Sequence, residues 1–356
     1  MKNPLRIAID ISPLESGHSI RGVGFYLRHL QEALTSYFPE NDYTFFNKSS
    51  DIPSEIDIVH YPYFDPYFIT LPIVKKYPTV VTVHDLTPII FRDKFPSGIK
   101  GGIKWQVQKQ NLKKVDGIIT DSHASQQDIV RLLNIPKEKV DVAYLAAGEG
   151  FHKITNEKLK IEKLKNKYNL PDKFILYVGD VTWNKNLPRL VQAVSRLEVP
   201  LVMVGKSLTQ KVYDRSNTWN HDLKIVQHIA EDNLNIQMLG FVESEELQLL
   251  YSAATMFVFP SIYEGFGLPI LEAMQSGCPV IISKESCMPE VGGDAAYYFE
   301  GYDTDSLANA IKKVFTDSSL QKRLSQKGII QAKKFSWEKT AYETIQAYKK
   351  VIEKPL

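Results

Sequence analysis

The chain has 356 residues, of which 44% are hydrophobic and 24% charged, and these near-average values exclude a disordered or collagen-like protein. Its 43 basic and 41 acidic residues give a formal net charge of +2, which is too small for a protein that neutralises many phosphates of a nucleic acid. Cys278 and Cys287 cannot by themselves build a disulfide framework or a four-cysteine zinc site, which indicates a reducing compartment.

The length and the first residues favour a cytoplasmic protein of two domains. A prior of about 150 residues per domain predicts two domains for this length. The N-terminal segment MKNPLRIAIDI contains an apolar stretch that Asp10 interrupts, so it is too short for a signal-peptide core. No other run reaches the roughly 18 uninterrupted apolar residues that a membrane span needs.

In chain order, short apolar runs rich in β-branched residues alternate with helical stretches, which predicts an α/β protein. Runs that are almost continuously apolar are typical of buried parallel strands. In the first half they lie at 5–11, 57–61, 79–85 and 117–122, with helices expected at 24–35 and 125–133. In the second half they lie at 173–180, 199–205, 235–240, 255–261 and 279–283. Each half is therefore predicted to be a doubly wound, Rossmann-like domain.

A lysine-rich stretch at 151–172 separates the two halves and is typical of a charged surface helix followed by a linker. We therefore expect a first domain at 1–170 and a second at 171–335. From Ser336 onward, apolar residues recur at nearly helical spacing, so 336–356 is predicted to be a helix. Its wide apolar side needs a surface to cover.

Two glycine-containing segments do not fulfil the phosphate-binding motifs that they suggest. The Gly205-Lys206-Ser207 segment ends like a P-loop, but Pro200 stands where the motif needs its first glycine. The segment at Gly22 and Gly24 has Leu27 in place of the third glycine of the dinucleotide fingerprint, so a nicotinamide dehydrogenase is unsupported.

Metal-binding patterns are also weak. Asp303 and Asp305 resemble a carboxylate pair for a divalent cation, but they directly precede a helical run, where aspartate is favoured as a cap. The eight histidines include no pair at i, i+4 with an intervening glutamate, which argues against zinc-protease chemistry. We expect no metal and no resident cofactor.

The segment 259–283, FPSIYEGFGLPILEAMQSGCPVIIS, carries the most specific signal. A strand ends at Pro260, a glycine-containing loop follows, Pro269 suits the first turn of a helix, and Gly277 ends that helix. Glycines let a backbone approach a ligand, and a helix N-terminus offers N–H groups and positive dipole charge to phosphates.

Two carboxylates lie eight residues apart in this segment, Glu264 in the loop and Glu272 one turn into the helix. Backbone groups would bind a phosphate between them, so the natural partners of the two carboxylates are hydroxyl groups. The segment therefore predicts a site for an extended ligand that carries both phosphates and hydroxyls.

The E-x7-E arrangement in YEGFGLPILEAMQSGCPVI resembles the donor-binding signature of the retaining glycosyltransferases of family four, which have the GT-B architecture of two Rossmann-like domains. The likeness covers nearly the whole chain and is more specific in the second half. The further matching segments are RGVGFYLRHLQEAL, TVVTVHDLTPIIF, TDSHASQQDI, YVGDVTWNKNLPRLVQAV, LGFVESEELQLLYSAA and MPEVGGDAA. The resemblance also implies that the 336–356 helix crosses back onto the first domain.

The resemblance implies a role for each matching residue. Glu264 would hold hydroxyls of the donor sugar and Glu272 those of the ribose, while Lys185 would neutralise the diphosphate. His84 would lie near the transferred sugar and the acceptor. In the first domain, Gly22 and Gly24 would approach the diphosphate. In the second domain, the sugar and diphosphate would be bound by the backbone amides of Gly265, Phe266, Gly267 and Leu268. The loop at Phe241 and Val242 would border the nucleobase.

Some of these residues also have ordinary structural interpretations. Gly22 and Gly24 are equally typical of a tight turn before a helix, and His84 of a hydrogen-bonded histidine at a strand end. One position departs from the pattern, because many family members carry an arginine where this chain has Asp180. The departure resembles a group of bacterial polysaccharide mannosyl- and rhamnosyl-type transferases that keep only the lysine, with Arg21 or Arg189 as candidate replacements.

The implied activity is transfer of a hexose such as mannose from a GDP- or UDP-sugar to a hydroxyl of a glycan or lipid-linked glycan, with retention of configuration and without a metal. The second domain would bind the donor and the first the acceptor. Two alternatives share the architecture: a non-catalytic protein that binds nucleotide-sugar or glycan, and a nucleotide-sugar epimerase.

A last feature bears on the acceptor. Residues 92–114 carry seven basic residues and one acidic residue, and apolar residues including Ile99, Ile103 and Trp105 lie among them. This composition suits a surface that rests on anionic lipid at the inner face of a membrane. In that interpretation, the GIKGGIK sequence at 98–104 forms a mobile approach to a helix. The alternative is a solvated helix whose apolar side packs in the core.

Overall fold

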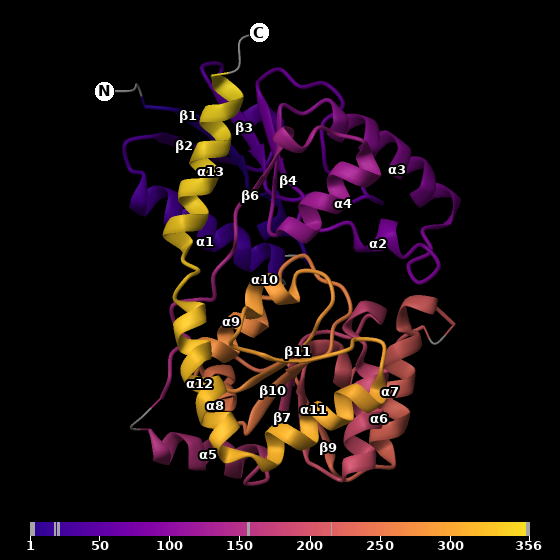
Figure 1. The fold of residues 1–356 in the computed structure, drawn as a ribbon. Coiled ribbons are helices and arrows are strands. Elements are labelled where there is room, and N and C mark those ends of the chain that lie inside the picture. Colours follow the sequence, from indigo (N-terminus) through magenta and orange to yellow (C-terminus); the bar gives the residue numbers. More distant parts are fainter. Residues whose placement is uncertain (1–3, 18, 20–21, 155–156, 215, 354–356) are drawn as a thin grey trace. The chain divides into compact units, whose positions relative to one another are not determined.

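The computed structural model describes residues 4–17, 19, 22–154, 157–214 and 216–353. It divides into two compact units (Figure 1). Unit 1 comprises residues 1–146 and 335–356, and unit 2 comprises residues 147–334. Each unit has its own parallel sheet of six strands, which is the doubly wound architecture that the apolar runs predict.

The sheet of unit 1 has the strand order β2-β1-β3-β4-β5-β6, and every pairing is parallel. The strands are β1 Arg6–Asp10, β2 Asp42–Phe46, β3 Ile58–Tyr61, β4 Thr79–Thr82, β5 Gly117–Thr120 and β6 Val140–Val142. The four strands predicted from apolar runs are the central ones, and three of them are buried throughout. The two unpredicted strands, β2 and β6, form the edges, where shorter or more polar runs suffice.

Helices connect these strands. They are η1 Ser12–Glu15, α1 Gly22–Tyr37, η2 Ser49–Asp51, α2 Thr87–Ile90, α3 Gly98–Lys113, α4 His123–Leu133, η3 Lys137–Lys139 and α13 Trp337–Ile352. The segment 98–104, predicted as a mobile approach, is helical from Gly98 onward. Gly101 lies so close to Ser97 that an added Cβ would come within 2.6 Å of the Ser97 Cβ, so glycine permits this tight helix start.

The sheet of unit 2 has the order β12-β11-β10-β7-β8-β9 and is also parallel. Its strands are β7 Ile175–Val178, β8 Leu201–Val204, β9 Ile236–Gly240, β10 Met256–Phe259, β11 Val280–Ser283 and β12 Tyr297–Phe299. Its helices are α5 Lys158–Tyr168, η4 Trp183–Lys185, α6 Leu187–Leu197, η5 Lys206–Thr209, η6 Thr218–Asn220, α7 His221–Glu231, α8 Ser244–Ala253, α9 Leu268–Gln275, α10 Met288–Gly292, α11 Thr304–Thr316 and α12 Ser318–Ala332.

The structure moves the boundary between the units from the expected position after residue 170 to a position after Ala146. Helix α5 belongs to unit 2 because it packs on α8 there. Leu164 is buried, and Lys167 and Tyr168 both bind Glu246, with Nζ–Oε1 and Oη–Oε2 distances of 2.6 Å each. These contacts could not be predicted from the lysine-rich sequence, because most of its residues do face solvent.

The C-terminal helix α13 is part of unit 1, although it is far from that unit in sequence (Figure 1). It packs on α1 and β5. The Tyr348 hydroxyl lies 2.7 Å from His60 Nδ1, and His60 Nε2 lies 2.8 Å from the Thr82 hydroxyl. The Thr82 hydroxyl also lies 3.0 Å from the Tyr26 hydroxyl, so a buried polar chain ties α13 to β3, β4 and α1. Burial lowers the pKa of His60 to about 3, which keeps its imidazole neutral.

Within the part of the chain that the structure describes, no helix combines the length and the apolar character needed to cross a bilayer.

The buried chain generates a stability prediction. Tyr348→Phe removes the hydroxyl that pairs with His60 Nδ1 and leaves a buried ring nitrogen without its partner, so the unfolding free energy should fall by about 1–3 kcal/mol. Tyr342→Phe, at a half-exposed position of the same helix, is the matched control and should change it by less than about 0.5 kcal/mol. Urea unfolding measures both, and equal stabilities of the two variants would contradict the structural role of Tyr348.

Candidate functional site

The strand order of unit 2 marks where a ligand can bind. Strands β7 and β10 are neighbours at the centre of the sheet, but the chain leaves β7 toward β8 on one side and β10 toward β11 on the other. Their loops, 179–186 and 260–267, therefore diverge at the carboxyl edge. This is the topological switch point at which open α/β sheets bind ligands.

Two asparagines lock these loops together. Asn184 Nδ2 donates to the Tyr263 carbonyl at 2.8 Å, and the Ile262 N–H donates to the Asn184 carbonyl at 2.8 Å. Asn186 adopts the left-handed conformation, with φ of 59°, and its Nδ2 donates to the Pro260 carbonyl at 3.0 Å. Asparagine tolerates this conformation better than most residues. The roles of Asn184 and Asn186 were not anticipated from sequence, although both flank Lys185 in the WNKN run.

The two charged residues predicted from opposite loops meet here. Lys185 Nζ lies 2.7 Å from Glu264 Oε1, with side chains 20% and 12% exposed. Lys185 Nζ also lies 5.2 Å from the centre of the Phe259 ring, a cation–π distance. The ion pair thus holds both side chains in place between the two loops, and both side chains remain partly exposed to a ligand.

The backbone after Glu264 is held from below. Ser286 Oγ donates to the Glu264 carbonyl at 3.0 Å, and the Cys287 thiol donates to the Phe266 carbonyl at 3.1 Å. Gly267 precedes α9 with φ of 98°, a conformation that favours glycine, and no side chain among the described residues caps this helix start. Uncapped N–H groups and the helix dipole make it suited to an anion.

Glu272 lies on α9, where its Oε2 accepts a hydrogen bond from the buried Tyr251 hydroxyl at 3.0 Å. Burial raises the pKa of Glu272 to about 7, and the hydrogen bond opposes this shift. A carboxylate with a perturbed pKa beside a candidate ligand-binding loop is typical of a functional group. Tyr251 is a further residue that sequence reasoning missed, because it lies on the preceding helix α8.

The other predicted donor residues differ in exposure. Gly265, Phe266 and Gly267 are buried and Leu268 is half-buried, so Phe266 can offer a ligand its backbone only. In the loop after β9, the Val242 side chain is buried at 6% exposure, whereas Phe241 beside it is 60% exposed.

The departure at Asp180 has a structural explanation. Asp180 Oδ1 accepts hydrogen bonds from the Ser207 N–H at 3.2 Å and the Ser207 hydroxyl at 2.8 Å, so it fixes the turn that follows β8. Arg189 donates to Asn186 Oδ1 at 2.5 Å and lies 5.7 Å from the centre of the Tyr302 ring, so it supports the Lys185 loop. Arg21 lies outside the described residues.

Asp303 caps α11, as its position before the helical run predicts. Its Oδ1 accepts from the Asp305 N–H at 2.8 Å and the Ser306 N–H at 3.1 Å. Within the described ranges, no three histidine, cysteine, aspartate or glutamate residues group as metal ligands.

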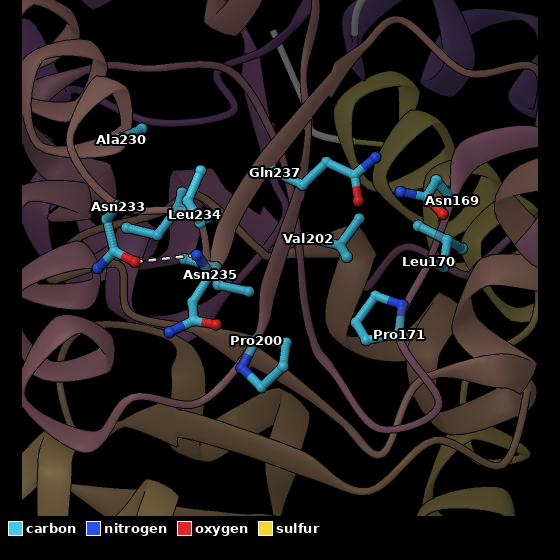
Figure 2. A pocket seen from close by; sticks show the side chains of 12 residues that line it. Asn169, Leu170, Pro171, Pro200, Val202, Ala230, Asn233, Leu234, Asn235 and Gln237 are labelled. Atoms are coloured by element: carbon cyan, nitrogen blue, oxygen red, sulfur yellow. Dashed lines mark hydrogen bonds between the residues drawn. The ribbon is translucent and has the colours of Figure 1, made fainter.

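A cavity of about 450 Å³ lies elsewhere in unit 2 (Figure 2). Its lining includes Pro200 and Asn235, which directly precede β8 and β9, so it opens at the amino edge of the sheet. Figure 2 shows Asn235 hydrogen-bonded to the side chain of Asn233, with an N–Oδ1 distance of 2.9 Å. This cavity is therefore separate from the Lys185 and Glu264 loops.

In unit 1, His84 follows β4 and Asp121 follows the neighbouring strand β5, so both lie at the carboxyl edge. His84 Nδ1 lies 2.7 Å from Asp121 Oδ2, and the Tyr26 ring meets the imidazole edge-on at 4.8 Å. Burial disfavours a charged His84, but the charge and hydrogen bond of Asp121 together with the Asp85 charge and a backbone hydrogen bond to Pro62 outweigh burial, so the pKa of His84 is raised above its ordinary value. Burial also raises the pKa of Asp121, although His84 opposes that shift.

Gly22 and Gly24 lie in the first turn of α1, so they are neither a free loop nor a turn ahead of the helix. Gly22 is exposed, and a Cβ added to it would meet no atom within 4 Å. The described packing therefore does not require glycine at position 22.

Comparison with known proteins is consistent with this geometry. Residues 160–351 match the family model "Glycosyl transferases group 1", and residues 16–146 match "Glycosyltransferase Family 4". The O-antigen chain mannosyltransferase B of Escherichia coli is 32% identical over 281 residues, 76% of this chain and 70% of that protein.

Two solved structures show the same fold across nearly the whole chain. Sucrose-phosphate synthase from Thermosynechococcus elongatus has a TM-score of 0.76 at 20% identity, covering 97% of this chain and 98% of that one. Anabaena Alr3699/HepE in complex with UDP and glucose has a TM-score of 0.71 at 16% identity, covering 96% and 98%.

Two Rossmann-like units of this kind define the GT-B class of glycosyltransferases. The chain belongs to the group 1 glycosyl transferases, with a first unit of glycosyltransferase family 4, and it resembles the mannosyltransferases of that group.

The raised pKa of Glu272 predicts that substituting this residue changes both the stability of the protein and the pH dependence of its nucleotide affinity. Because the folded protein holds a proton on Glu272 up to about pH 7, while the unfolded chain releases it near its ordinary pKa of 4.5, this group lowers the unfolding free energy as pH rises through that window. Glu272→Gln should therefore raise stability at pH 8, by on the order of 1 kcal/mol. The ionised carboxylate accepts hydroxyl hydrogen bonds more strongly, so the affinity for GDP or UDP, the nucleotides of the expected donor, should rise more steeply through about pH 7 in the parent than in Glu272→Gln.

Calorimetric titration with GDP and UDP at pH 6, 7 and 8, together with urea unfolding at pH 8, measures these effects. Glu245→Gln on the exposed start of α8 is the control and should leave both properties unchanged. A Glu272→Gln variant that keeps the parent's pH dependence of binding would rule out the assignment.

Proposed function

We propose that the protein is a retaining mannosyltransferase that moves the sugar of a GDP- or UDP-linked donor to a hydroxyl of a glycan or lipid-linked glycan, without a metal. The observation that carries this proposal is the Lys185–Glu264 pair, which joins the loop after β7 to the loop before the uncapped start of α9, at the switch point of the unit 2 sheet. An amine, a helix N-terminus and two carboxylates on adjacent segments match a ligand with a diphosphate between two polyhydroxy groups.

In the proposed reaction, the bond between the anomeric carbon and the diphosphate oxygen breaks, and a bond to the acceptor oxygen forms. Negative charge grows on the departing diphosphate, where Lys185 and the N–H groups at the start of α9 stabilise it. Glu264 accepts hydrogen bonds from the sugar hydroxyls, and Glu272 accepts them from the ribose. The acceptor proton passes to the departing diphosphate, so no protein nucleophile is needed.

Unit 1 contributes the acceptor side in this proposal. The acceptor would meet His84, and the hydrogen bond to Asp121 fixes the orientation of the His84 ring. The similarity to an O-antigen chain mannosyltransferase supports mannose as the sugar and a polysaccharide as the product. The reaction would then take place in the cytoplasm, at the inner face of the membrane.

A coupled assay of nucleotide release tests the proposal. With GDP-mannose, UDP-glucose and other donors, release should depend on a mannose-containing or lipid-linked glycan acceptor, and the product should gain one hexose of unchanged anomeric configuration by mass spectrometry and NMR. Because Lys185 and α9 stabilise the leaving group, activity should persist in EDTA. Glu264→Ala should lower kcat about ten- to a hundredfold, the loss expected for a hydrogen bond to a charged group.

The alternatives give different results in the same assay. An epimerase would change the donor without any acceptor, and a non-catalytic binding protein would bind nucleotide without releasing product. Loss of activity in EDTA that Mn²⁺ or Mg²⁺ restores would contradict the metal-independent mechanism.

A further inference from the structure

One side of unit 1 exposes apolar side chains from two segments. On α3, Ile99, Ile103 and Val107 follow each other at intervals of four residues and so share one face of the helix. Ile99 is 85% exposed and Ile103 is 62% exposed. The segment 66–78 adds its own exposed apolar residues, namely Phe68, Ile69, Ile73 and Val74. We call these seven residues the apolar–basic face, together with the lysines of the two segments.

The two segments form one surface because polar contacts join them. The buried Gln108 on the inner side of α3 donates through Nε2 to the Thr70 hydroxyl at 2.7 Å. Lys75 Nζ donates to the Asn111 carbonyl at 3.1 Å, and Lys104 Nζ lies 5.0 Å from the centre of the Phe68 ring. The exposed residues are thus held by a folded base.

The helix divides its apolar residues between the core and this face. Trp105 is 3% exposed and packs in the unit 1 core, as the core-packing interpretation predicts. Ile99 and Ile103 do not pack there, so that interpretation explains only one side of α3. Large apolar side chains exposed together indicate a surface that another body covers.

The charge of the apolar–basic face indicates the chemistry of the partner that covers it. Segments 66–78 and 96–115 contain no acidic residue, in a protein whose net charge is only +2. Their basic residues are Lys75, Lys76, Lys100, Lys104, Lys109, Lys113 and Lys114. Protruding apolar side chains among lysines complement an anionic lipid surface, where the apolar groups enter the acyl boundary and the lysines meet the headgroups.

We propose that the apolar–basic face docks on an anionic phospholipid bilayer. Helix α3 lies on the crossover from β4 to β5, so its N-terminal end, with Ile99, lies toward the carboxyl edge of the sheet that also holds His84. Docking therefore brings that edge toward the membrane. The inference rests on the surface alone, and lipid binding requires no turnover, so its failure and the failure of the proposed reaction are separate results.

Sedimentation of the full chain with vesicles tests the proposal. The protein should bind vesicles of phosphatidylcholine with about 30% phosphatidylglycerol and should not bind vesicles of phosphatidylcholine alone. Salt at about 0.5 M shortens the Debye length to roughly 4 Å, so it should weaken the binding. Lys100→Gln with Lys104→Gln should weaken it about thirtyfold, since each basic residue near an anionic surface contributes about fivefold. Ile99→Ser with Ile103→Ser should remove the binding that persists in high salt.

The matched control is Lys158→Gln with Lys163→Gln on α5, another lysine-rich exposed helix, which should bind vesicles like the parent. Ile99, Ile103, Lys100, Lys158 and Lys163 are exposed, and Lys104 is half-buried with its amine over the Phe68 ring, so the variants should keep an unfolding midpoint close to that of the parent. Equal binding to both vesicle types, or equal loss in the α3 and α5 variants, would overturn the proposal. So would a concentration-dependent dimer that the α3 substitutions abolish in the absence of vesicle binding, which would assign the face to a second copy of the chain.

Discussion

The ion pair between Lys185 and Glu264 is the interaction on which the proposed donor site depends. It forms because β7 and β10 are neighbours in the unit 2 sheet, which brings together two loops that are far apart in sequence. Asn184 and Asn186 hold the lysine loop against the glutamate loop from both sides of the lysine. A half-buried pair of this kind is costly unless it is well supported, and here the support comes from backbone carbonyls and the Phe259 ring.

Unit 1 uses the same logic with different chemistry. His84 and Asp121 follow adjacent strands, so a parallel sheet places them side by side at its carboxyl edge. Tyr26, which packs against the His84 ring, begins a buried chain of hydrogen bonds that reaches Tyr348 on α13. The last helix of the chain, α13, therefore stabilises β4, the strand that His84 follows.

Much of the fold could be predicted because buried parallel strands leave almost continuously apolar runs, and the segment 259–283 was recognisable because glycine, proline and glutamate have positional roles in it. The edge strand β2 and the boundary after Ala146 were missed, since partly exposed segments carry weak patterns. Pairings between distant residues were also missed. The spacing of Lys185 and Glu264 in sequence says nothing of their 2.7 Å contact, and Asp121 could have been paired with His84 only by assuming that their strands are neighbours.

In the proposed reaction, the diphosphate of the donor lies against Lys185. The most direct measurement is calorimetric titration of GDP and UDP into the double variant Lys185→Met with Glu264→Gln, which removes both charges together and leaves neither unpaired. Lys224→Met, at an exposed position on α7, is the control. Nucleotide binding should be at least about tenfold weaker in the double variant, because a hydrogen bond to a charged group is lost, and the control should keep the parental affinity. Parental affinity in a folded double variant would contradict this position of the diphosphate.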